Sequence, residues 1–291
     1  MDKHNISISV ISLANPWLDW LPASEAAQAA QKINDEVNQA CSQYPGRLFA
    51  FGTLPLSGGI RVNLSEIARL KSLDYVRGVV LGTTGLGKGL DDPELLPIFE
   101  ALQDAGLPIF LHPHYGLPGS VWGDKSSDYG HVLPLALGFP LETTIAVTRM
   151  ILADVFSKVP DLSIILAHSG GTLPFLAGRI ESCIEHDAHL KTAGKLGPQR
   201  RTVWDVLKKN IYLDAVIYSE VGLEAAIKAS GEDRVMFGTD HPFFPPLESG
   251  DAPWQSVQSN YEAIRGALET TEKGVSGVLG GNAMRVLKLI A

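Results

Sequence analysis

The sequence has few of the features that mark secreted, membrane or disulfide-rich proteins. It contains only two cysteines, Cys41 and Cys183, among its 291 residues. Two cysteines cannot form a disulfide framework, and neither lies in a Cys-x-x-Cys metal-binding spacing. No apolar stretch approaches the roughly 20 residues that a membrane helix needs, and residues 1–5 are not a charged leader followed by an apolar segment. We therefore expect a cytoplasmic protein with reduced cysteines.

Clusters of basic residues are also missing. The formal net charge is −8, and no group of Lys and Arg offers a surface for nucleic acid or an anionic membrane. A small molecule is therefore the expected partner. With 45% hydrophobic residues, a chain of this length can bury one large core, so we expect residues 1–291 to form one domain.

The sequence does contain short apolar runs that alternate with helical segments. The runs predicted as strands are 6–13, 48–54, 76–81, 107–112, 162–168, 210–216 and 234–239. Helices are predicted at 24–43, 63–72, 92–103, 141–156, from the turn at 170–174 through Arg179 to His186, and at 220–230, 255–270 and 275–289. Ser24 is the expected N-cap of the first helix. Residues 113–132 and 192–201 are predicted loops, and the first is long enough to cover a site.

This alternation is typical of a parallel sheet wound by right-handed crossovers. A closed (β/α)8 barrel needs eight strands, whereas seven are predicted and the first begins almost at residue 1. The expected fold is therefore α/β, a TIM-type (β/α)8 barrel that lacks its first strand and helix. An open doubly wound sheet is the competing fold, but no glycine-rich dinucleotide turn follows an early strand.

Three of the predicted strands end in a side chain that can bind a metal or transfer a proton. Asp240 follows Gly-Thr, where a carboxylate can bind a divalent cation through one oxygen and move a proton with the other. A neutral His112 imidazole suits Zn²⁺, and His168, followed by two glycines, could be a second ligand or a proton donor. The structural alternatives are a turn cap for Asp240 and a buried core histidine for His112. His114 and His131 flank the long loop as possible rim residues.

Three further residues are candidates for binding a substrate at the same mouth. Arg179 lies eleven residues beyond His168, where its guanidinium could hold a carboxylate in a bidentate pair or form an ordinary surface ion pair. Asn15, at the end of the first strand, could hydrogen-bond a planar amide. Phe243, close to Asp240, could cover a flat ring.

Several ordered segments resemble the amidohydrolase-related decarboxylases typified by aminocarboxymuconate-semialdehyde decarboxylase. They are Pro45-Gly46-Arg47-Leu48-Phe49-Ala50-Phe51-Gly52-Thr53-Leu54-Pro55, Leu111-His112-Pro113, Leu166-Ala167-His168-Ser169-Gly170-Gly171 and Phe237-Gly238-Thr239-Asp240-His241-Pro242-Phe243. Within that family, segments 12–17 and 214–220 look closest to the fungal isoorotate (5-carboxyuracil) decarboxylases. The resemblance covers nearly the whole chain and implies an amidohydrolase-like barrel, a divalent metal such as Zn²⁺, and a homodimer or homotetramer.

The resemblance also implies roles for individual residues. His112 and Asp240 would ligate the metal, His168 would contact the substrate or assist proton transfer, and Asn15, Arg179 and Phe243 would bind the substrate. Members of the family add a His-x-His pair from their first barrel strand, and none lies upstream of Ile6 here, in agreement with the strand count. Tyr218 stands where the aminocarboxymuconate enzymes have a histidine, which argues against that substrate.

Three functions follow from these observations. The first is metal-dependent, non-oxidative decarboxylation of a planar carboxylated substrate, with 5-carboxyuracil as the best candidate and Asp240 as proton donor to the ring. The second is hydrolysis of a lactone or amide, with Asp240 activating a metal-bound water. The third is a catalytically incomplete barrel that binds ligands or subunits. The sequence has no fingerprint of a redox cofactor.

Overall fold

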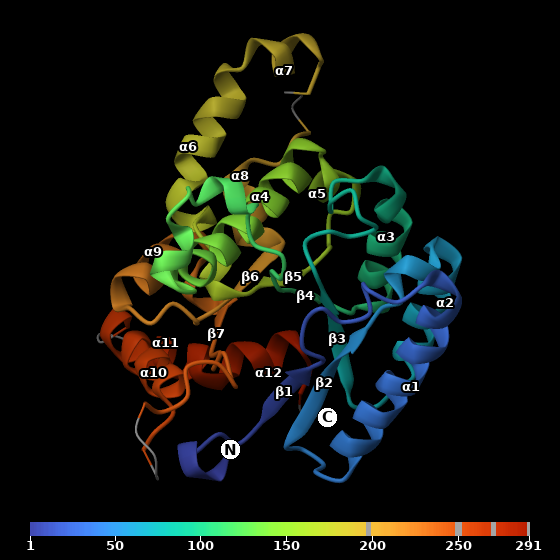
Figure 1. The fold of residues 1–291 in the computed structure, drawn as a ribbon, viewed down its shortest axis with the longest axis vertical. Coiled ribbons are helices and arrows are strands. Elements are labelled where there is room, and N and C mark those ends of the chain that lie inside the picture. The colour runs from blue at the N-terminus through green and yellow to red at the C-terminus, as the bar shows by residue number, and fades with distance from the viewer. Residues whose placement is uncertain (196–198, 248–251, 269–271, 290–291) are drawn as a thin grey trace.

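The computed structural model describes residues 1–195, 199–247, 252–268 and 272–289. In these ranges one parallel sheet has the order β1-β2-β3-β4-β5-β6-β7 (Figure 1). Its strands are β1 (Ser9–Ser12), β2 (Leu48–Thr53), β3 (Val76–Leu81), β4 (Ile109–Leu111), β5 (Ile164–Leu166), β6 (Ile211–Asp214) and β7 (Val235–Met236). The predicted strands and their parallel order are confirmed. Within the described ranges β1 pairs only with β2 and β7 only with β6, so the curled sheet stays open between its edge strands.

Helices follow the strands on the outside of the curled sheet (Figure 1). They are α1 (Ala23–Ser42), α2 (Ile60–Leu70), α3 (Leu96–Ala105), α4 (Phe139–Leu152), α5 (Val155–Lys158), α6 (Leu173–His186), α7 (Ala188–Thr192), α8 (Val203–Lys209), α9 (Glu220–Ser230), α10 (Gln255–Ala267), α11 (Glu272–Ser276) and α12 (Asn282–Val286). A π-helical turn, η6 (Pro134–Gly138), leads into α4, and another, η9 (Gly277–Gly281), joins α11 to α12.

Several predicted boundaries are wrong. The helix α1 begins at Ala23 after Pro22, without a side-chain cap, so Ser24 is not the N-cap. The segment 275–289 is α11, η9 and α12 rather than one helix, because a π-helical turn interrupts it. The predicted end of the helix at 270 and part of the loop 192–201 lie outside the described residues.

The helices α7 and α8 were not predicted, because each is short. A signal for α8 does exist in the sequence. Thr202 and Asp205 form a capping box, in which each side chain accepts a hydrogen bond from the backbone N–H of the other residue. A Thr followed three residues later by an acidic side chain is a recognisable start of a helix.

Successive residues along each strand face two different apolar layers, one on each side of the sheet. Phe110, Ile165, Tyr212 and Met236 lie in a cluster inside the curled sheet, whereas the residues that flank them, such as Leu111 and Leu166, pack in the larger core beneath the helices. This alternation follows from the two-residue period of a strand. It also determines which residues beyond each strand point to the inside.

The amino ends of the strands are closed by the C-terminal segment. Leu287 and Leu289, just beyond α12, are each 5% exposed and join the inner apolar cluster. Arg77, near the start of β3, donates a hydrogen bond to the carbonyl of Lys288 and lies over the ring of Phe49. The end of the barrel opposite the strand tips is therefore filled by apolar side chains.

The expectation that no apolar stretch approaches the length of a membrane helix is wrong for one helical stretch, residues 134–152. Among the described residues it alone is long and apolar enough to cross a membrane by length and composition. In the fold this stretch is η6 and α4, and Val147 and Met150 of α4 are fully buried in the core beneath the helices. In the fold 44% of the apolar window of this stretch is buried, and a core helix passes the same compositional test, so one such stretch is weak evidence for a membrane span.

Candidate metal and catalytic site

The register of the sheet brings the residues that follow neighbouring strands to one level. Leu111, Leu166 and Leu213 are aligned across β4, β5 and β6, so the next inward positions lie side by side at the carboxyl ends of these strands. His112 is two residues beyond the inward Phe110, and Asp214 is two residues beyond the inward Tyr212. Carboxyl ends of parallel strands are where barrel enzymes place their chemistry.

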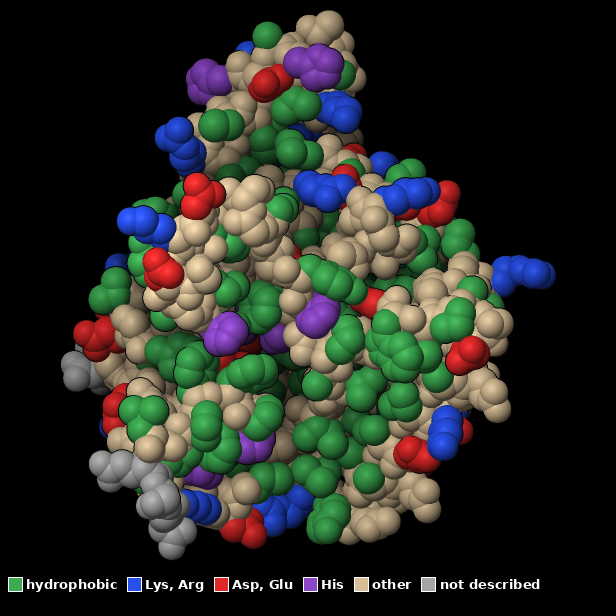
Figure 2. All heavy atoms as spheres, in the orientation of Figure 1, with side chains coloured by type: hydrophobic (Ala, Val, Ile, Leu, Met, Phe, Trp, Pro, Cys, Tyr) green, Lys and Arg blue, Asp and Glu red, His purple; other side chains and the backbone are tan. Residues whose placement is uncertain are grey.

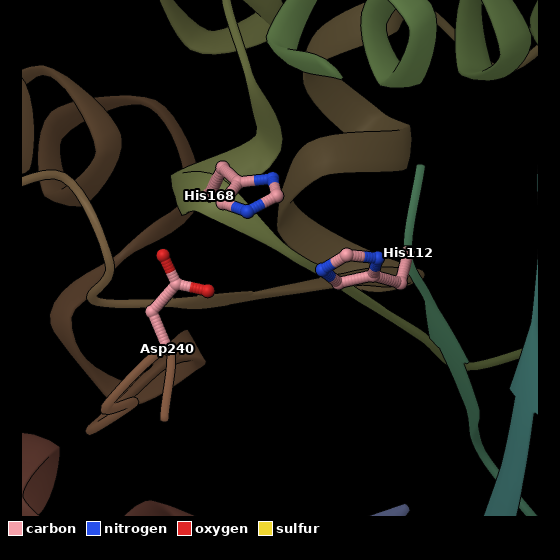
Figure 3. A group of neighbouring side chains, drawn as sticks. All are labelled: His112, His168 and Asp240. Carbon is pink, nitrogen blue, oxygen red and sulfur yellow. The ribbon is translucent and has the colours of Figure 1, made fainter. Parts of the chain in front are cut away.

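His112, His168 and Asp240 form one cluster at this end. Each offers a ligand atom, and these atoms lie within 4.8 Å of one another. Figure 3 shows the three side chains converging on a common space from three separate segments. Figure 2 shows histidine side chains gathered near the middle of one face of the molecule, with hydrophobic side chains around them. The expected proximity of the three residues is confirmed.

The ring of His112 is held in one orientation by its own loop. Its Nδ1 lies 2.6 Å from the carbonyl oxygen of Pro113. A carbonyl can only accept, so Nδ1 carries the proton and Nε2 keeps a lone pair. Burial, together with the charge of His168, lowers the pKa of His112 to about 4. The imidazole is therefore neutral at pH 7, as a metal ligand must be.

His168 lies in a strained turn immediately after β5. Its φ is 56°, and that of Ser169 is 50°, both in the left-handed region. Burial lowers the pKa of His168 to about 4. The Nδ1 atom of His168 is buried and has no hydrogen-bond partner among the described residues. A buried polar atom without a partner costs free energy, so this atom is suited to a ligand.

Asp214 supports this turn from the neighbouring strand. Its carboxylate accepts hydrogen bonds from the backbone N–H groups of Ser169, at 2.9 Å, and Val216, at 3.1 Å. The hydroxyl of Ser169 donates to the carbonyl of Asp214 at 2.8 Å. Burial raises the pKa of Asp214 to about 7. Asp214 lies between the strands that carry His168 and Asp240 and fixes the backbone of the first.

Asp240 is oriented by Tyr218. The hydroxyl of Tyr218 donates to Oδ2 of Asp240 at 2.6 Å, and no described residue donates to the other oxygen. Burial raises the pKa of Asp240, while Tyr218 and His112 lower it. Burial and the Asp240 carboxylate both raise the pKa of Tyr218, so its hydroxyl stays protonated and remains a donor. The other oxygen of Asp240 is left for a metal, and Oδ2 keeps a second lone pair that can take a proton.

The donor set fits a divalent cation. Two neutral imidazoles and one carboxylate are a usual ligand set for catalytic Zn²⁺ and for related transition metals. The resemblance supplied only two ligands, His112 and Asp240, whereas the structure adds His168 to them. A third protein ligand is what a catalytic metal site generally requires.

The predicted substrate-binding residues do not all lie beside the metal-ligand cluster. Asn15 is half-buried just beyond β1, and Phe243 is 49% exposed three residues after Asp240. Arg179 is exposed on α6, which extends away from the barrel toward α7 (Figure 1), and has no hydrogen-bond partner among the described residues. Within this chain, the structure does not bring Arg179 into the cluster of ligand atoms.

Other residues at this end of the barrel were not predicted from the sequence. Trp17 is buried, and its ring lies 6.4 Å from that of His112 and 6.0 Å from that of His114. The buried carboxylate of Glu142 accepts the backbone N–H groups of His114 and Gly116. His114 was expected only as a rim residue. Trp17 could have been predicted from the Asn15-Pro16-Trp17 motif, because a large aromatic side chain just after a strand is expected to pack at that end of the barrel.

The fold and the cluster define a class: an α/β barrel with a His-His-Asp metal site at the carboxyl ends of its strands. A family model described as amidohydrolase matches residues 5–289, and the chain belongs to the amidohydrolase family.

The relatives of the chain are decarboxylases. The 2-amino-3-carboxymuconate-6-semialdehyde decarboxylase of Dictyostelium discoideum is 32% identical over 99% of this chain and 75% of its own length. The gamma-resorcylate decarboxylase of Rhizobium sp. is 29% identical over 99% of this chain and 85% of its own. Accordingly, the chain is a metal-dependent carboxy-lyase of this family.

Solved structures agree with this assignment. IDCase of Metarhizium anisopliae, crystallised in apo form, is 62% identical and superimposes with a TM-score of 0.97 over 99% of this chain and 77% of its own. The dihydroxybenzoic acid decarboxylase of Polaromonas sp. JS666, 25% identical with a TM-score of 0.78 over 99% of this chain and 84% of its own, holds manganese and the inhibitor 2-nitroresorcinol. Similar barrels thus carry a divalent metal.

Proposed function

We propose that this chain, acting as one domain of residues 1–291, converts 5-carboxyuracil (isoorotate) to uracil and CO₂ with Zn²⁺ as its metal. The convergence of His112, His168 and Asp240 carries this proposal, because the three groups can hold one cation beside a bound ring. The 62% identity to IDCase of Metarhizium anisopliae supports a decarboxylase of this kind, and the resemblance of segments 12–17 and 214–220 to isoorotate decarboxylases supports the substrate.

The reaction balances without a redox partner. The bond between the ring carbon and the carboxylate breaks, the electron pair stays on the ring carbon, and CO₂ leaves. Asp240 delivers a proton to that carbon, giving uracil. Burial raises the pKa of Asp240, so its carboxyl holds a proton more readily than an exposed one. Tyr218 keeps the carboxyl in position through Oδ2.

His112, His168 and Asp240 would hold the cation. Bound there, it would supply positive charge beside the substrate carboxylate and the adjacent ring carbonyl. His168 would also contact the substrate, and Asn15 and Phe243 would bind the ring from the two loops at the mouth. For Arg179 we propose contact with the substrate carboxylate, although the residue is exposed on α6.

The chain is further proposed to work in the cytoplasm as a homodimer or homotetramer. Exposed apolar side chains support self-association: Phe175 on α6 is 83% exposed, and Val221 on α9 is 73% exposed. Contiguous exposed apolar surface commonly marks a protein interface. Light scattering on the purified chain gives the mass that decides between a monomer and these assemblies.

The first test combines elemental analysis with CO₂ release from 5-carboxyuracil. We expect about one divalent metal ion per chain and turnover, and loss of both in His112→Asn. The matched control is His131→Asn, since His131 is an exposed histidine of the long loop. Metal without CO₂ release from 5-carboxyuracil would reject the substrate. A chain with neither metal nor turnover at any added Zn²⁺ would support the catalytically incomplete barrel.

A further inference from the structure

Two more polar atoms are buried without partners beside the His112–His168–Asp240 cluster. They are Nε1 of Trp17 and Nδ1 of His114. Neither was assigned a role above. Buried donors and acceptors in folded proteins nearly always have a partner, so two orphaned atoms on neighbouring rings at a site call for an explanation.

The indole of Trp17 is fixed in place. Trp17 is 6% exposed, and its φ of 52° lies in the left-handed region. One edge of its six-membered ring packs on Gly82 just after β3, where an added Cβ would come within 2.5 Å of Cζ3 of Trp17. Because Cζ3 and Nε1 lie on opposite edges of an indole, this packing directs Nε1 away from Gly82. Gly82 therefore leaves space that the indole requires.

His114 is fixed by the same part of the molecule. Its backbone N–H donates to Oε1 of Glu142 at 3.1 Å, and the hydroxyl of Thr83, next to Gly82, donates to the same oxygen. Glu142 thus ties the end of β3 to the loop after β4. The ring of His114 lies edge-on to that of Trp17, with 72° between their planes. The orphaned Nδ1 is therefore held by an anchored backbone.

The chemistry of the two atoms selects a ligand. An indole N–H can only donate, so it requires an acceptor on the ligand, whereas a neutral imidazole nitrogen accepts or donates according to its tautomer. A cyclic amide presents a carbonyl and an N–H on adjacent ring atoms in a fixed plane. A carbocyclic ring with hydroxyl substituents has no such fixed pair.

We propose that Trp17 Nε1 and His114 Nδ1 form a subsite that recognises the amide edge of a planar heterocyclic substrate, with the carbonyl accepting from Trp17 and the ring N–H donating to His114. The inference rests on the proposed function, since it specifies how the same site selects a pyrimidine-like ring. The two residues lie next to the metal cluster, because the ring of Trp17 also contacts that of His112.

The test is the binding of uracil, which has the amide edge but no carboxylate, by calorimetry on the full chain. Trp17→Phe and His114→Phe keep aromatic rings in place and remove the two nitrogens. We expect each to weaken uracil binding by about tenfold, as loss of one hydrogen bond at a desolvated site does. The controls are Trp20→Phe, which changes a 70%-exposed tryptophan of the same segment, and His131→Phe. Both should bind uracil as the wild type does.

A second readout covers the case in which a variant fails to fold. In the wild-type chain the ¹⁵N–¹H signal of the Trp17 indole, assigned by comparison with Trp17→Phe and Trp20→Phe, should shift when uracil is added and not when 1,3-dimethyluracil is added. Absence of uracil binding, a signal indifferent to uracil, or unchanged affinity in both variants would overturn the subsite and leave water as the partner of the two atoms.

The subsite and the proposed function fail in different ways. If uracil binding depends on Trp17 and His114 but 5-carboxyuracil yields no CO₂, the subsite stands and the decarboxylation substrate is wrong. If CO₂ is released with an unchanged KM in both variants, the proposed function stands and the subsite is refuted.

Discussion

The two ends of the same seven strands are built differently. At the amino end, Leu287 and Leu289 are 5% exposed and pack into the inner apolar cluster. At the carboxyl end, Trp17, His114 and His168 each bury a polar atom that has no partner among the described residues. At the amino end these side chains pack against other parts of the chain, whereas at the carboxyl end the three polar atoms are left for a ligand to contact. Barrels generally divide stability and chemistry between their two ends in this way.

Backbone conformation shows the same division. Most residues other than glycine with a left-handed φ lie at the carboxyl end: Trp17, His168, Ser169, Tyr218, Asp240 and Phe244. Each costs on the order of 1 kcal/mol relative to an ordinary conformation. Such a concentration of strain persists because the surrounding groups hold it, as the Asp214 carboxylate holds Ser169. The carboxyl end is therefore less stable than its apolar content suggests.

The largest effect that separates the two ends is expected for Asp240→Asn. Loss of the proton donor and of a metal ligand should reduce CO₂ release by at least about a thousandfold. Stability should change little, because Asn tolerates the left-handed φ of 51° at this position. The control Asp104→Asn alters an exposed carboxylate of α3. A variant that keeps a tenth of the activity would show that Asp240 is not the proton donor.

The converse change is Leu287→Ala at the amino end. Removing a buried leucine side chain should lower the free energy of unfolding by about 2–5 kcal/mol, through lost transfer free energy and the cavity left behind. Turnover per folded molecule should be unchanged, as measured by urea denaturation and CO₂ release at low temperature. Leu247→Ala, at a position 94% exposed, is the control. A fall in kcat with normal stability would mean that the two ends are coupled.

Asp214→Asn tests whether stability and chemistry overlap within the carboxyl end. The pKa of Asp214 is about 7 in the folded chain and ordinarily 3.8. The folded state therefore retains a proton that the unfolded state releases between those values. On account of this group, the unfolding free energy of the wild type falls as pH rises from about 4 to about 7.

The Asn side chain does not titrate, so the variant lacks this dependence. The free energy of unfolding of the variant, minus that of the wild type, should therefore rise by at least about 1 kcal/mol as pH rises from about 4 to about 7. Urea denaturation at several pH values measures the difference, in which the contributions of the other groups cancel. Metal affinity should fall by about 10–100-fold, since groups that orient a ligand have effects of that size. A stability difference that is constant with pH would refute the raised pKa.

Tyr218→Phe should have the smallest effect. Its hydroxyl lowers the pKa of Asp240, so removing it should raise that pKa further, as measured by carboxyl ¹³C NMR on the metal-free chain. Activity should fall by about tenfold or less. Tyr44→Phe, at a 57%-exposed position, is the control. If the pKa of Asp240 falls instead, the hydrogen bond between the two side chains is not formed in solution.

Much of this architecture was predictable from local patterns. Apolar runs alternating with helical segments gave the seven strands and their order, because a buried strand and an amphipathic helix each have a periodicity that single residues reveal. A polar residue immediately after such a run marked His112 and Asp240. The helix α8 was missed because seven residues are too few to show a period, although the capping box at Thr202 identifies it.

Other features depended on contacts between distant segments. The sequence determined that His112, His168 and Asp240 follow separate strands, and a parallel sheet then requires them to meet at one end. Only the tertiary structure decided that Asp214 supports the turn of His168, that Tyr218 binds Asp240, and that the rings of Trp17 and His114 lie together. These pairs are separated in the chain by 22 to 97 residues. Hydrogen bonds and ring contacts over such separations depend on loop conformation, which the periodicity of strands and helices does not encode.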